Sequence, residues 1–262
     1  MRFQTDIYQL GIKPGKPAEN FDRFLNLYQQ NPAPSEGLPR LIVLPELWLS
    51  GYDFPHIRSR SRADFEQELD RLSGFARHSG CYFSAGSVGE RAEGNFFNTS
   101  YLFDPGGKII GKYRKQKLFP LMDEPEMFKP GGDSPVFDTP LGKIGVLICY
   151  DLRFPELARE MVAQGAQIMI FPSEFPHPRL HHFRTLLLAR AIENQVFVLA
   201  ANRCGADSSL SFCGHSSIID PWGNVMAEAG AEEEIISAVI DLDLATEVRR
   251  KIPALEGIIN PV

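Results

Sequence analysis

The sequence predicts an α/β fold in which buried β-strands form the interior and helices cover their outer faces. Short aliphatic runs, typical of buried strands, are followed by segments whose apolar residues recur at helical spacing. The same coarse order of helix, strand, helix and strands occurs in both halves of the chain, although there is no true repeat. The chain has 262 residues, 44% of them hydrophobic, which is enough to bury a full core. Because no linker or change of composition divides it, we expect one domain over residues 1–262.

Two amphipathic helices and a buried strand are predicted in the first half. The apolar run before Glu46 has the length of a buried strand, and a turn follows at Gly51 and Tyr52. The second helix is expected to end at Gly80, because glycine readily adopts the left-handed conformation that ends helices. The predicted elements are helices over 17–30 and 63–79, a Pro-rich loop over 31–39, a strand over 41–45, a hairpin-like pair over 82–88 and 99–103, a turn over 104–107 and a strand over 108–111.

The second half is predicted to alternate buried strands with helices and to end in a hairpin. A long irregular segment over 121–138 precedes it, and loops of this length in compact domains are usually functional or mobile. The inward face of the second helix is expected to carry Leu186, Leu187, Ala191 and Ile192. The predicted elements are strands over 144–148, 167–171 and 197–201, helices beginning near Pro155 and over 183–193, and a hairpin of 216–219 and 235–240 that includes a turn over 220–223.

The composition excludes several classes of function. A net charge of −6 and a pI near 5.6 give no basic surface for nucleic acid or an anionic membrane. The N-terminus lacks the charged-then-apolar layout of a signal peptide, and no window approaches the ~20 apolar residues of a membrane span. We therefore expect a soluble, cytoplasmic protein with no nucleic-acid or membrane partner. Its 4 cysteines are scattered and form no C-x-x-C pair, which predicts reduced thiols.

Three polar residues at or beside the ends of apolar strands have complementary chemistry. Cys149 stands where the strand over 144–148 changes to a helical pattern, and nearby free backbone N–H groups predict a lowered pKa for its thiol. Glu46 ends an earlier strand, where a carboxylate is costly unless it is paired or solvated. With Lys115 they could supply a nucleophile, a base and a cation that stabilises an oxyanion. Taken singly, Cys149 could be a small buried hydrophobe and Glu46 a helix cap or a surface ion pair.

The segments around these residues resemble a known family. LPELWLSGY around Glu46, KYRKQKLF around Lys115 and ICYDLRFPELAR around Cys149 are similar to the three signature segments of the nitrilase superfamily of carbon–nitrogen hydrolases. The resemblance covers nearly the whole chain and continues through residues 186–205 and the later DPWGNV turn. It is nearest to the Nit-type branch and the omega-amidases, which are single-domain amidases.

The resemblance implies a fold and an oligomer. The family has an α-β-β-α sandwich, in which two central mixed β-sheets are flanked by helices. Its members commonly form homodimers in which two sandwiches stack into a longer one. The helices that begin near Phe154 and His182 are the expected interface elements, because the family places equivalent helices there.

The resemblance also implies catalytic roles. Cys149 is the implied nucleophile, Glu46 the general base, and Lys115 the residue that stabilises the oxyanion and the transition state. Lys115 is chosen over Lys117 because the family lysine follows Tyr-Arg, as it does here. The chain departs from the family at Lys117, where many relatives have histidine.

A second glutamate and a substrate pocket are implied as well. Family members use a glutamate in the loop before a Pro-Gly, and Glu124 has the matching spacing, with Glu126 as the alternative. The substrate-binding candidates are Tyr52, Tyr150, Glu174 and Phe175, and a substrate carboxylate could be held by Arg179 or Arg184.

The implied activity is hydrolysis of a small linear amide, favouring an ω-amide of a dicarboxylic acid. Cys149 would attack the carbonyl carbon, Lys115 and the backbone N–H of Tyr150 would hold the oxyanion, and a thioester would form as ammonia leaves. Water activated by Glu46 would then release the acid. A nitrilase would use the same residues, a ligand-binding or scaffold relative would need a broken triad, and a redox sensor would oxidise Cys149 without hydrolysis.

No cofactor or metal is expected. His177 and His181 are four residues apart, but Pro178 interrupts a helix between them and no cysteine or acidic pair completes a site. We therefore expect His177, His181 and His182 to belong to a polar loop at the rim of the pocket. The segment 118–135 is a candidate to close over that pocket.

Overall fold

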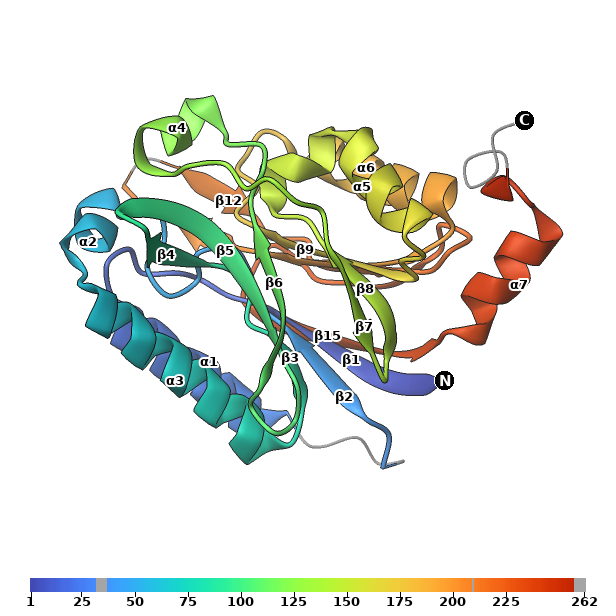
Figure 1. The fold of residues 1–262 in the computed structure, drawn as a ribbon, viewed down its shortest axis with the longest axis horizontal. Helices are drawn as coiled ribbons and strands as arrows, with labels where there is room; N and C mark the ends of the chain where they lie inside the picture. Colours follow the sequence, from blue (N-terminus) through green and yellow to red (C-terminus); the bar gives the residue numbers. More distant parts are fainter. Residues whose placement is uncertain (32–36, 209, 257–262) are drawn as a thin grey trace.

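The computed structural model describes residues 1–31, 37–208 and 210–256. Two β-sheets pack face to face in its interior, and helices cover the outer face of each sheet (Figure 1). This arrangement confirms the expected α-β-β-α sandwich. The Pro-rich loop predicted over 31–39 falls largely on residues 32–36, which lie outside the described part of the chain.

The first sheet has seven strands in the order β15-β1-β2-β3-β5-β4, and β6 also pairs with β5. The pairs β1–β2 and β2–β3 are parallel and the others are antiparallel, so the sheet is mixed, as expected. Its strands are β1 (Arg2–Gln9), β2 (Arg40–Val43), β3 (Tyr82–Ser84), β4 (Val88–Ala92), β5 (Asn95–Phe103), β6 (Ile109–Arg114) and β15 (Glu234–Asp241).

The second sheet has six strands in the order β14-β13-β10-β9-β8-β7. Its central strands β8, β9 and β10 are parallel, and the outer pairs are antiparallel. Its strands are β7 (Val136–Thr139), β8 (Gly142–Val146), β9 (Ile168–Ser173), β10 (Phe197–Asn202), β13 (Ser217–Ile219) and β14 (Val225–Glu228). A small separate sheet pairs β11 (Cys204–Ala206) with β12 (Ser211–Cys213).

Two pairs of helices form the outer layers. α1 (Pro17–Gln30) and α3 (Arg62–Ser79) cover the first sheet, and α5 (Pro155–Ala163) and α6 (Leu180–Asn194) cover the second (Figure 1). Gly80 follows α3 with a φ of 66°, which confirms the predicted helix end. The shorter elements are α2 (Phe54–Ser59), a 3₁₀ turn at Pro120–Met122, α4 (Glu124–Met127), a 3₁₀ turn at Cys149–Arg153 and α7 (Asp243–Lys251). Among the described residues, no helix is both long enough and apolar enough to cross a membrane.

Strand β2 shows why its sequence is a continuous apolar run. Leu41 and Val43 belong to the hydrophobic cluster between the two sheets, whereas Ile42 belongs to the cluster under α1 and α3. All three side chains are fully buried. A strand that is covered on both faces requires apolar residues at every position rather than at alternate ones. The same double coverage brings the end of β2, and Glu46 after it, into the interior of the molecule.

The strand predicted over 82–88 is interrupted in the structure. β3 ends at Ser84 and β4 begins at Val88, because Gly86 turns the chain with a φ of 62°. A Cβ atom at Gly86 would lie 1.9 Å from the carbonyl oxygen of Pro45. Only glycine therefore permits this close approach, which packs the turn against the segment that carries Glu46.

The hairpin predicted for 216–219 and 235–240 is wrong. β13 pairs with β14 after the predicted turn, whereas β15 crosses to the first sheet and pairs with β1. β1 is absent from the sequence prediction because polar residues interrupt its apolar pattern. These residues, Thr5, Asp6 and Gln9, are nevertheless fully buried in the structure.

The predicted inward face of α6 is partly wrong. Leu187 and Ala191 are fully buried, as expected, but Ile192 is 54% exposed and Leu186 is only half-buried. The buried face instead starts at Phe183, so that its apolar positions follow at intervals of four residues. Ile192 lies outside that face and points to the surface.

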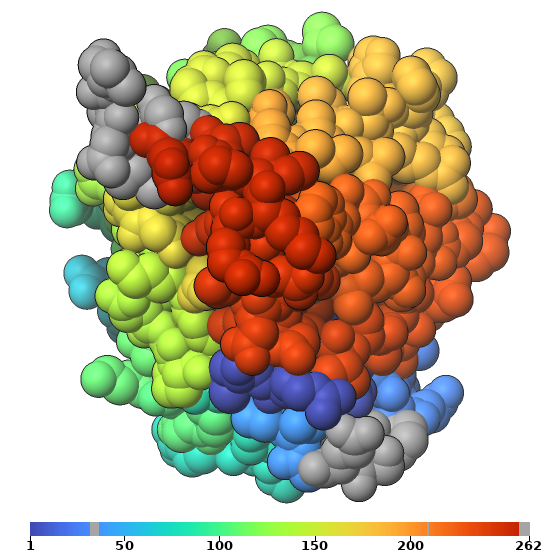
Figure 2. Space-filling model, turned by 90° about the vertical axis from the view of Figure 1, so that its right-hand side faces the viewer, coloured from blue at the N-terminus to red at the C-terminus, as the bar shows by residue number. Residues whose placement is uncertain are grey.

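Helix α7 joins the two sheets at one end of the sandwich. Figure 2 shows the C-terminal segment, in red, on this face of the molecule next to the blue N-terminal strand. Arg249 of α7 donates hydrogen bonds to the carbonyl oxygens of Ala166, at 2.7 Å, and Gln195, at 3.3 Å, which precede β9 and β10. Because β15 before it belongs to the first sheet, α7 ties one sheet to the other.

Candidate active site

Segments from both sheets bring the three motif residues together. Glu46 follows β2 and Lys115 follows β6 of the first sheet, whereas Cys149 follows β8 of the second. The side chains of Glu46 and Lys115 are fully buried, and Cys149 is 4% exposed. The alternatives of a surface ion pair or an exposed helix cap for Glu46 are therefore wrong.

The ammonium group of Lys115 lies between two carboxylates. Its Nζ donates to Oε1 of Glu46 at 2.7 Å and to Oε1 of Glu124 at 2.8 Å. The same two oxygens accept hydrogen bonds from the Tyr52 hydroxyl, at 2.9 and 3.1 Å, and from Asn98 Nδ2, at 2.8 and 3.2 Å. One cation and two neutral donors thus hold the carboxylates in a fixed arrangement.

The protonation states follow from this arrangement. Burial lowers the pKa of Lys115, but the carboxylates of Glu124 and Glu46 outweigh it and raise that pKa well above its ordinary value. Lys115 therefore stays an ammonium. Burial raises the pKa of Glu124, and Lys115 lowers it, while the charge of Glu46 raises it further. Glu124 therefore keeps a proton more readily than an ordinary glutamate does.

The two oxygens of Glu46 have different surroundings. Oε1 accepts from Lys115, Tyr52 and Asn98, as described above. Oε2 accepts a hydrogen bond from the backbone N–H of Glu174, at 3.0 Å. A carboxylate oxygen has two lone pairs, so Oε2 retains capacity to accept a proton from a neighbouring group.

The thiol of Cys149 is close to these charges, and its expected lowered pKa is wrong. Burial raises the pKa of Cys149 well above its ordinary value, and the carboxylates of Glu46 and Glu124 act in the same direction. Lys115 and the backbone of Glu174 oppose them without reversing the result. The sequence argument considered the backbone N–H groups after the strand but not the two buried carboxylates. Cys149 is therefore protonated at rest and would need a base in order to act as a nucleophile.

The backbone of Cys149 is held in an unusual conformation. Its φ is 47°, in the left-handed region that costs a non-glycine residue of order 1 kcal/mol or more. The buried carboxylate of Asp151 braces it, because its oxygens accept from the N–H of Ile148 at 2.9 Å, the N–H of Lys117 at 2.8 Å and the hydroxyl of Tyr113 at 2.8 Å. Burial raises the pKa of Asp151 to about 6, although Lys115 lowers it.

Burial distinguishes the two pairs of neighbouring candidates, the lysines Lys115 and Lys117 and the glutamates Glu124 and Glu126. Lys115 is buried against the carboxylates, whereas Lys117 is half-buried with its ammonium 5.0 Å from the ring centre of Phe154. Glu124 is fully buried, whereas Glu126 is exposed. The geometry therefore favours the residues selected from the sequence.

The predicted pocket residues lie in different environments. Tyr52 contacts Glu46 and Glu124 directly, as described above. Tyr150 is half-buried, and its ring lies 4.7 Å from that of Phe119. Phe175 is buried, and its ring centre is 5.0 Å from that of Phe183, so it packs in the core as well as standing near the site.

Glu174 is buried, and its side chain forms an ion pair with Arg203 at 2.7 Å. Its carboxyl is thus engaged with the protein, while its backbone N–H contacts Glu46. Of the two arginines expected to hold a substrate carboxylate, Arg184 is paired with Glu228 at 2.6 Å. The guanidinium of Arg179 lies 5.7 Å from the ring centre of Phe119.

Of the three histidines expected in a polar loop, only His177 lies in the loop after β9, whereas His181 and His182 lie in the first turn of α6, so that part of the prediction is wrong. His177, His181 and His182 are exposed. Within the ranges 1–31, 37–208 and 210–256, no group of three or more histidine, cysteine and acidic side chains is arranged to hold a metal ion.

Four residues of the site are missing from the sequence prediction. Asp151 lies within the ICYDLRF motif, which was a usable signal, and Arg153 lies in the same motif. Asn98 is one of several polar residues in β5, beside Thr99 and Ser100, and gives no signal of its own. Arg203 was recognised only as a residue at the end of a strand, because its partner Glu174 is 29 positions away.

Comparison with known proteins identifies the family. A family profile described as carbon-nitrogen hydrolase matches residues 6–250. The chain belongs to the carbon–nitrogen hydrolase family. The hydrolase is 40% identical over 258 residues to the 2-oxoglutaramate amidase of Bacillus subtilis, covering 98% of both chains.

Two further relatives support the same assignment. The hydrolase is 36% identical over 262 residues to the omega-amidase NIT2 of Xenopus tropicalis, covering 96% of this chain and 93% of the relative. The structure of Saccharomyces cerevisiae Nit3, a member of branch 10 of the nitrilase superfamily, matches with a TM-score of 0.87 and 33% identity, covering 96% of this chain and 94% of Nit3. The resemblance found in the sequence motifs is confirmed, and the hydrolase is an amidase-type enzyme rather than a non-catalytic scaffold.

Proposed function

We propose that the hydrolase converts an ω-amide of a small dicarboxylic acid to the acid and ammonia, with Cys149 as nucleophile, Glu46 as general base, and Lys115 and Glu124 as supporting residues. The observation that carries this proposal is the buried cluster in which Lys115 is hydrogen-bonded to Glu46 and Glu124, close enough for all three charges to act on the thiol of Cys149. The names of the relatives, 2-oxoglutaramate amidase and omega-amidase, support the substrate class.

The first step transfers a proton as a bond forms. The S–H bond of Cys149 breaks, its proton moves to Oε2 of Glu46, and the sulfur bonds to the amide carbon. General-base help is required because burial keeps the thiol protonated. The carbonyl oxygen becomes an oxyanion, which Lys115 and the backbone N–H of Tyr150 stabilise; each donor is worth roughly 3 kcal/mol of barrier.

The second half of the reaction reuses the same carboxyl group. Glu46 gives its proton to the leaving nitrogen, the C–N bond breaks, ammonia departs, and a thioester remains on Cys149. Water then loses a proton to Glu46 and attacks the thioester carbon, and the C–S bond breaks as Glu46 returns that proton to the sulfur, which regenerates the thiol. Glu124 and Tyr52 hold Lys115 and Glu46 in position through both halves of the reaction.

We assign the distal carboxylate of the substrate to Arg153. Its guanidinium lies 6.0 Å from the ring centre of Tyr150 and 5.3 Å from that of Phe175, four residues beyond the nucleophile. No carboxylate of the described residues forms an ion pair with it. Its Nη2 lies 3.4 Å from Nδ1 of His182, and a guanidinium stacked on aromatic rings can still bind a carboxylate through its remaining N–H groups. Arg184 is a poorer candidate because Glu228 already occupies it.

Intact-mass spectrometry with a parallel ammonia assay tests the proposal. The protein is mixed with succinamate, glutaramate, the neutral amide valeramide and the matching nitriles, and compared with Cys149→Ala and Glu46→Gln. We expect ammonia release from the ω-amides, an acyl adduct that maps to Cys149, and a loss of at least about 10⁴-fold in the Cys149→Ala variant. Release from nitriles but not amides would favour a nitrilase, and full turnover by Cys149→Ala would refute the mechanism.

We also propose a cytoplasmic homodimer that associates through α5 and α6. The exposed side chains of Ile192 on α6 and of Trp222 and Met226 beside it support this surface. Light scattering after gel filtration checks it: the wild type is expected at twice the mass of one chain, and Ile192→Glu at one. A wild-type monomer would contradict it. The 4 cysteines, all free in the structure, are consistent with a reducing compartment.

A further inference from the structure

The peptide that donates to Glu46 is clamped on both sides. The backbone carbonyl of Ser173 accepts from the N–H of Arg203 at 3.0 Å, and the N–H of Phe175 donates to Oδ1 of Asn202 at 2.7 Å. These bonds join the ends of the parallel strands β9 and β10. The N–H of Glu174 between them therefore has a fixed direction, toward Oε2 of Glu46.

The side chain of Glu174 adds a buried ion pair to this clamp. Its Oε2 accepts from Nη1 of Arg203 at 2.7 Å, and both side chains are fully buried. The other nitrogen of Arg203, Nη2, reaches the carbonyl of Ile12 and the carboxylate of Asp207, each at 3.1 Å, and the guanidinium lies 3.8 Å from the ring centre of Phe212. Arg203 is thus held from four directions.

Two buried atoms of this pair lack a hydrogen-bond partner among the described residues, Nε of Arg203 and one carboxyl oxygen of Glu174, Oε1. Structural buried carboxylates normally have every oxygen satisfied. A half-satisfied carboxyl next to a catalytic carboxylate is therefore more typical of a group that changes its proton content than of a simple brace.

We propose that Glu174, held by Arg203, is a positioning residue whose negative charge drives the transfer of the Cys149 proton to Glu46. This inference rests on the proposed function of Glu46 as the base. The N–H of Glu174 fixes the accepting oxygen, and its carboxylate repels negative charge on Glu46. Protonating Glu46 relieves that repulsion, so an ionised Glu174 favours the proton transfer.

The charges around Glu174 set the pH at which its carboxyl ionises and begins to favour the proton transfer. Burial raises the pKa of Glu174 to about 7; Arg203 lowers it, and Glu46 and Asp207 raise it. The hydroxyl of Tyr52 also lies among the carboxylates of Glu46, Glu124 and Glu174. Because the active form of Glu174 is the ionised one, its contribution is absent well below pH 7 and complete above it.

The variant Glu174→Gln tests this directly, because it resembles the protonated carboxyl at every pH. We measure kcat/KM of wild type and variant from pH 5.5 to 9. The ratio of wild type to variant is expected to be near one below pH 6 and to rise through pH 7 to about tenfold above pH 8, which corresponds to roughly one pKa unit of interaction. A ratio that stays constant with pH, whether one or larger, would overturn the proposal, since a purely structural defect acts equally at all pH values.

Arg203→Met supplies a second, signed test. Arg203 lowers the pKa of Glu174, so its removal is expected to move the inflection in kcat/KM to higher pH. An inflection that stays at pH 7 would contradict the role of this pair. If the variant does not fold, the Glu174→Gln result still decides.

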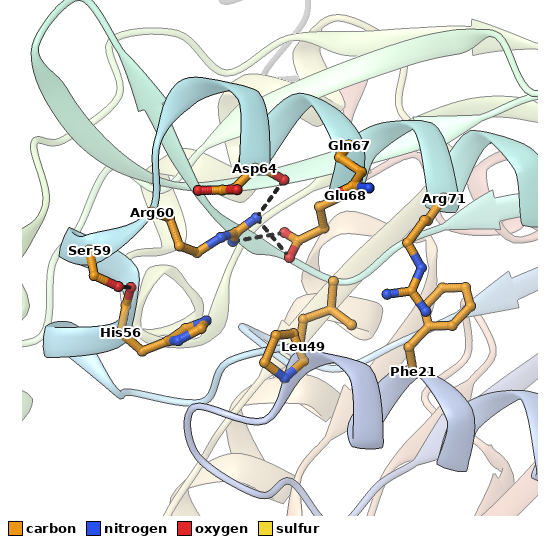
Figure 3. Close-up of a pocket in the computed structure, with 10 residues that line it drawn as sticks. Phe21, Leu49, His56, Ser59, Arg60, Asp64, Gln67, Glu68 and Arg71 are labelled. Carbon is orange, nitrogen blue, oxygen red and sulfur yellow. Dashed lines mark hydrogen bonds and ion pairs between the residues drawn. The ribbon is translucent and has the colours of Figure 1, made fainter.

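A matched control exists elsewhere in the molecule. Glu68 is also buried, its pKa is also raised by burial, and it pairs with Arg60 at 3.0 Å, between α2 and α3 (Figure 3). Glu68→Gln removes the same charge from the same kind of pair at a distance from Glu46. Its ratio to wild type is expected to be flat with pH; a rise like that of Glu174→Gln would show that any buried glutamate produces the effect and would overturn the proposal.

A measurement without substrate separates this inference from the proposed function. The rate at which iodoacetamide alkylates Cys149, followed by peptide mass mapping, reports transfer of the thiol proton whether or not any amide is hydrolysed. We expect the same pH-dependent ratio between wild type and Glu174→Gln. If that ratio appears but no amide is turned over, the positioning role of Glu174 stands and the substrate assignment is wrong. A ratio that does not change with pH would refute the positioning role and leave the proposed function untouched.

Discussion

The two sheets supply the site in different ways. The first sheet contributes charged and polar side chains, Glu46, Asn98 and Lys115, which bind one another through hydrogen bonds of 2.7 to 2.8 Å. The second contributes a thiol and an amide N–H, those of Cys149 and Glu174, whose directions depend on the backbone. Removing one of a set of mutually paired buried charges leaves its partners unpaired. A group that the backbone orients loses its position only gradually as its supporting hydrogen bonds are removed. Substitutions on the two sides should therefore differ in size.

Among substitutions that leave the thiol of Cys149 in place, the largest effect is expected on the side of the first sheet, from Lys115→Met. Two buried carboxylates lose their shared cation, so kcat/KM should fall about 10³-fold and the free energy of unfolding by about 3–5 kcal/mol. The variant carboxylates can relieve their repulsion by binding protons, so the loss of stability should be greater at pH 8 than at pH 5. Steady-state kinetics and urea unfolding at both pH values measure this.

Lys117→Met is the control for that change. Lys117 is two residues away and half-buried, so its kcat/KM should stay within about threefold of wild type. Equal losses in the two variants would contradict the special position of Lys115 and remove the contrast between the sheets.

An intermediate effect is expected on the side of the second sheet, from Asp151→Asn. The amide nitrogen cannot accept hydrogen bonds, so part of the brace on Ile148, Lys117 and Tyr113 is lost. We expect kcat to fall about 10- to 100-fold with KM little changed, because Cys149 is misplaced while the substrate contacts remain. Kinetics with a melting curve check this; wild-type kcat would show that the brace is unnecessary.

The last predicted effect concerns stability rather than rate, and is a pH dependence that isolates Asp151. Its pKa is raised to about 6 in the folded state from an ordinary 3.8, so the folded state binds its proton more tightly. This contribution, about 3 kcal/mol, is complete below pH 4 and is lost as pH rises through 6. The free energy of unfolding of the wild type minus that of Asp151→Asn should therefore fall by that amount between pH 4 and 7. A difference that is independent of pH would contradict the shift.

The sequence predicted the parts of the structure that depend on local pattern. The continuous apolar runs before Glu46 and Cys149 gave buried strands, and the motifs around them gave the family and its fold. The pKa of Cys149 was mispredicted because its direction depends on Glu46 and Glu124, which reach it through space. Asn98 is invisible for the same reason, since its role exists only after β5 and β6 place it beside Lys115.

The pairing of β1 with β15 has a consequence for how the protein is made. Residues as far apart as Arg2 and Asp241 are directly opposite in these strands. Contacts of such long sequence separation form slowly, and a nascent chain on the ribosome cannot close them until its last strand has emerged. Until then β1 leaves one edge open and able to pair with another chain. Biosynthesis of this enzyme is thus exposed to aggregation during translation, and a chaperone that shields the N-terminal strand would raise its yield.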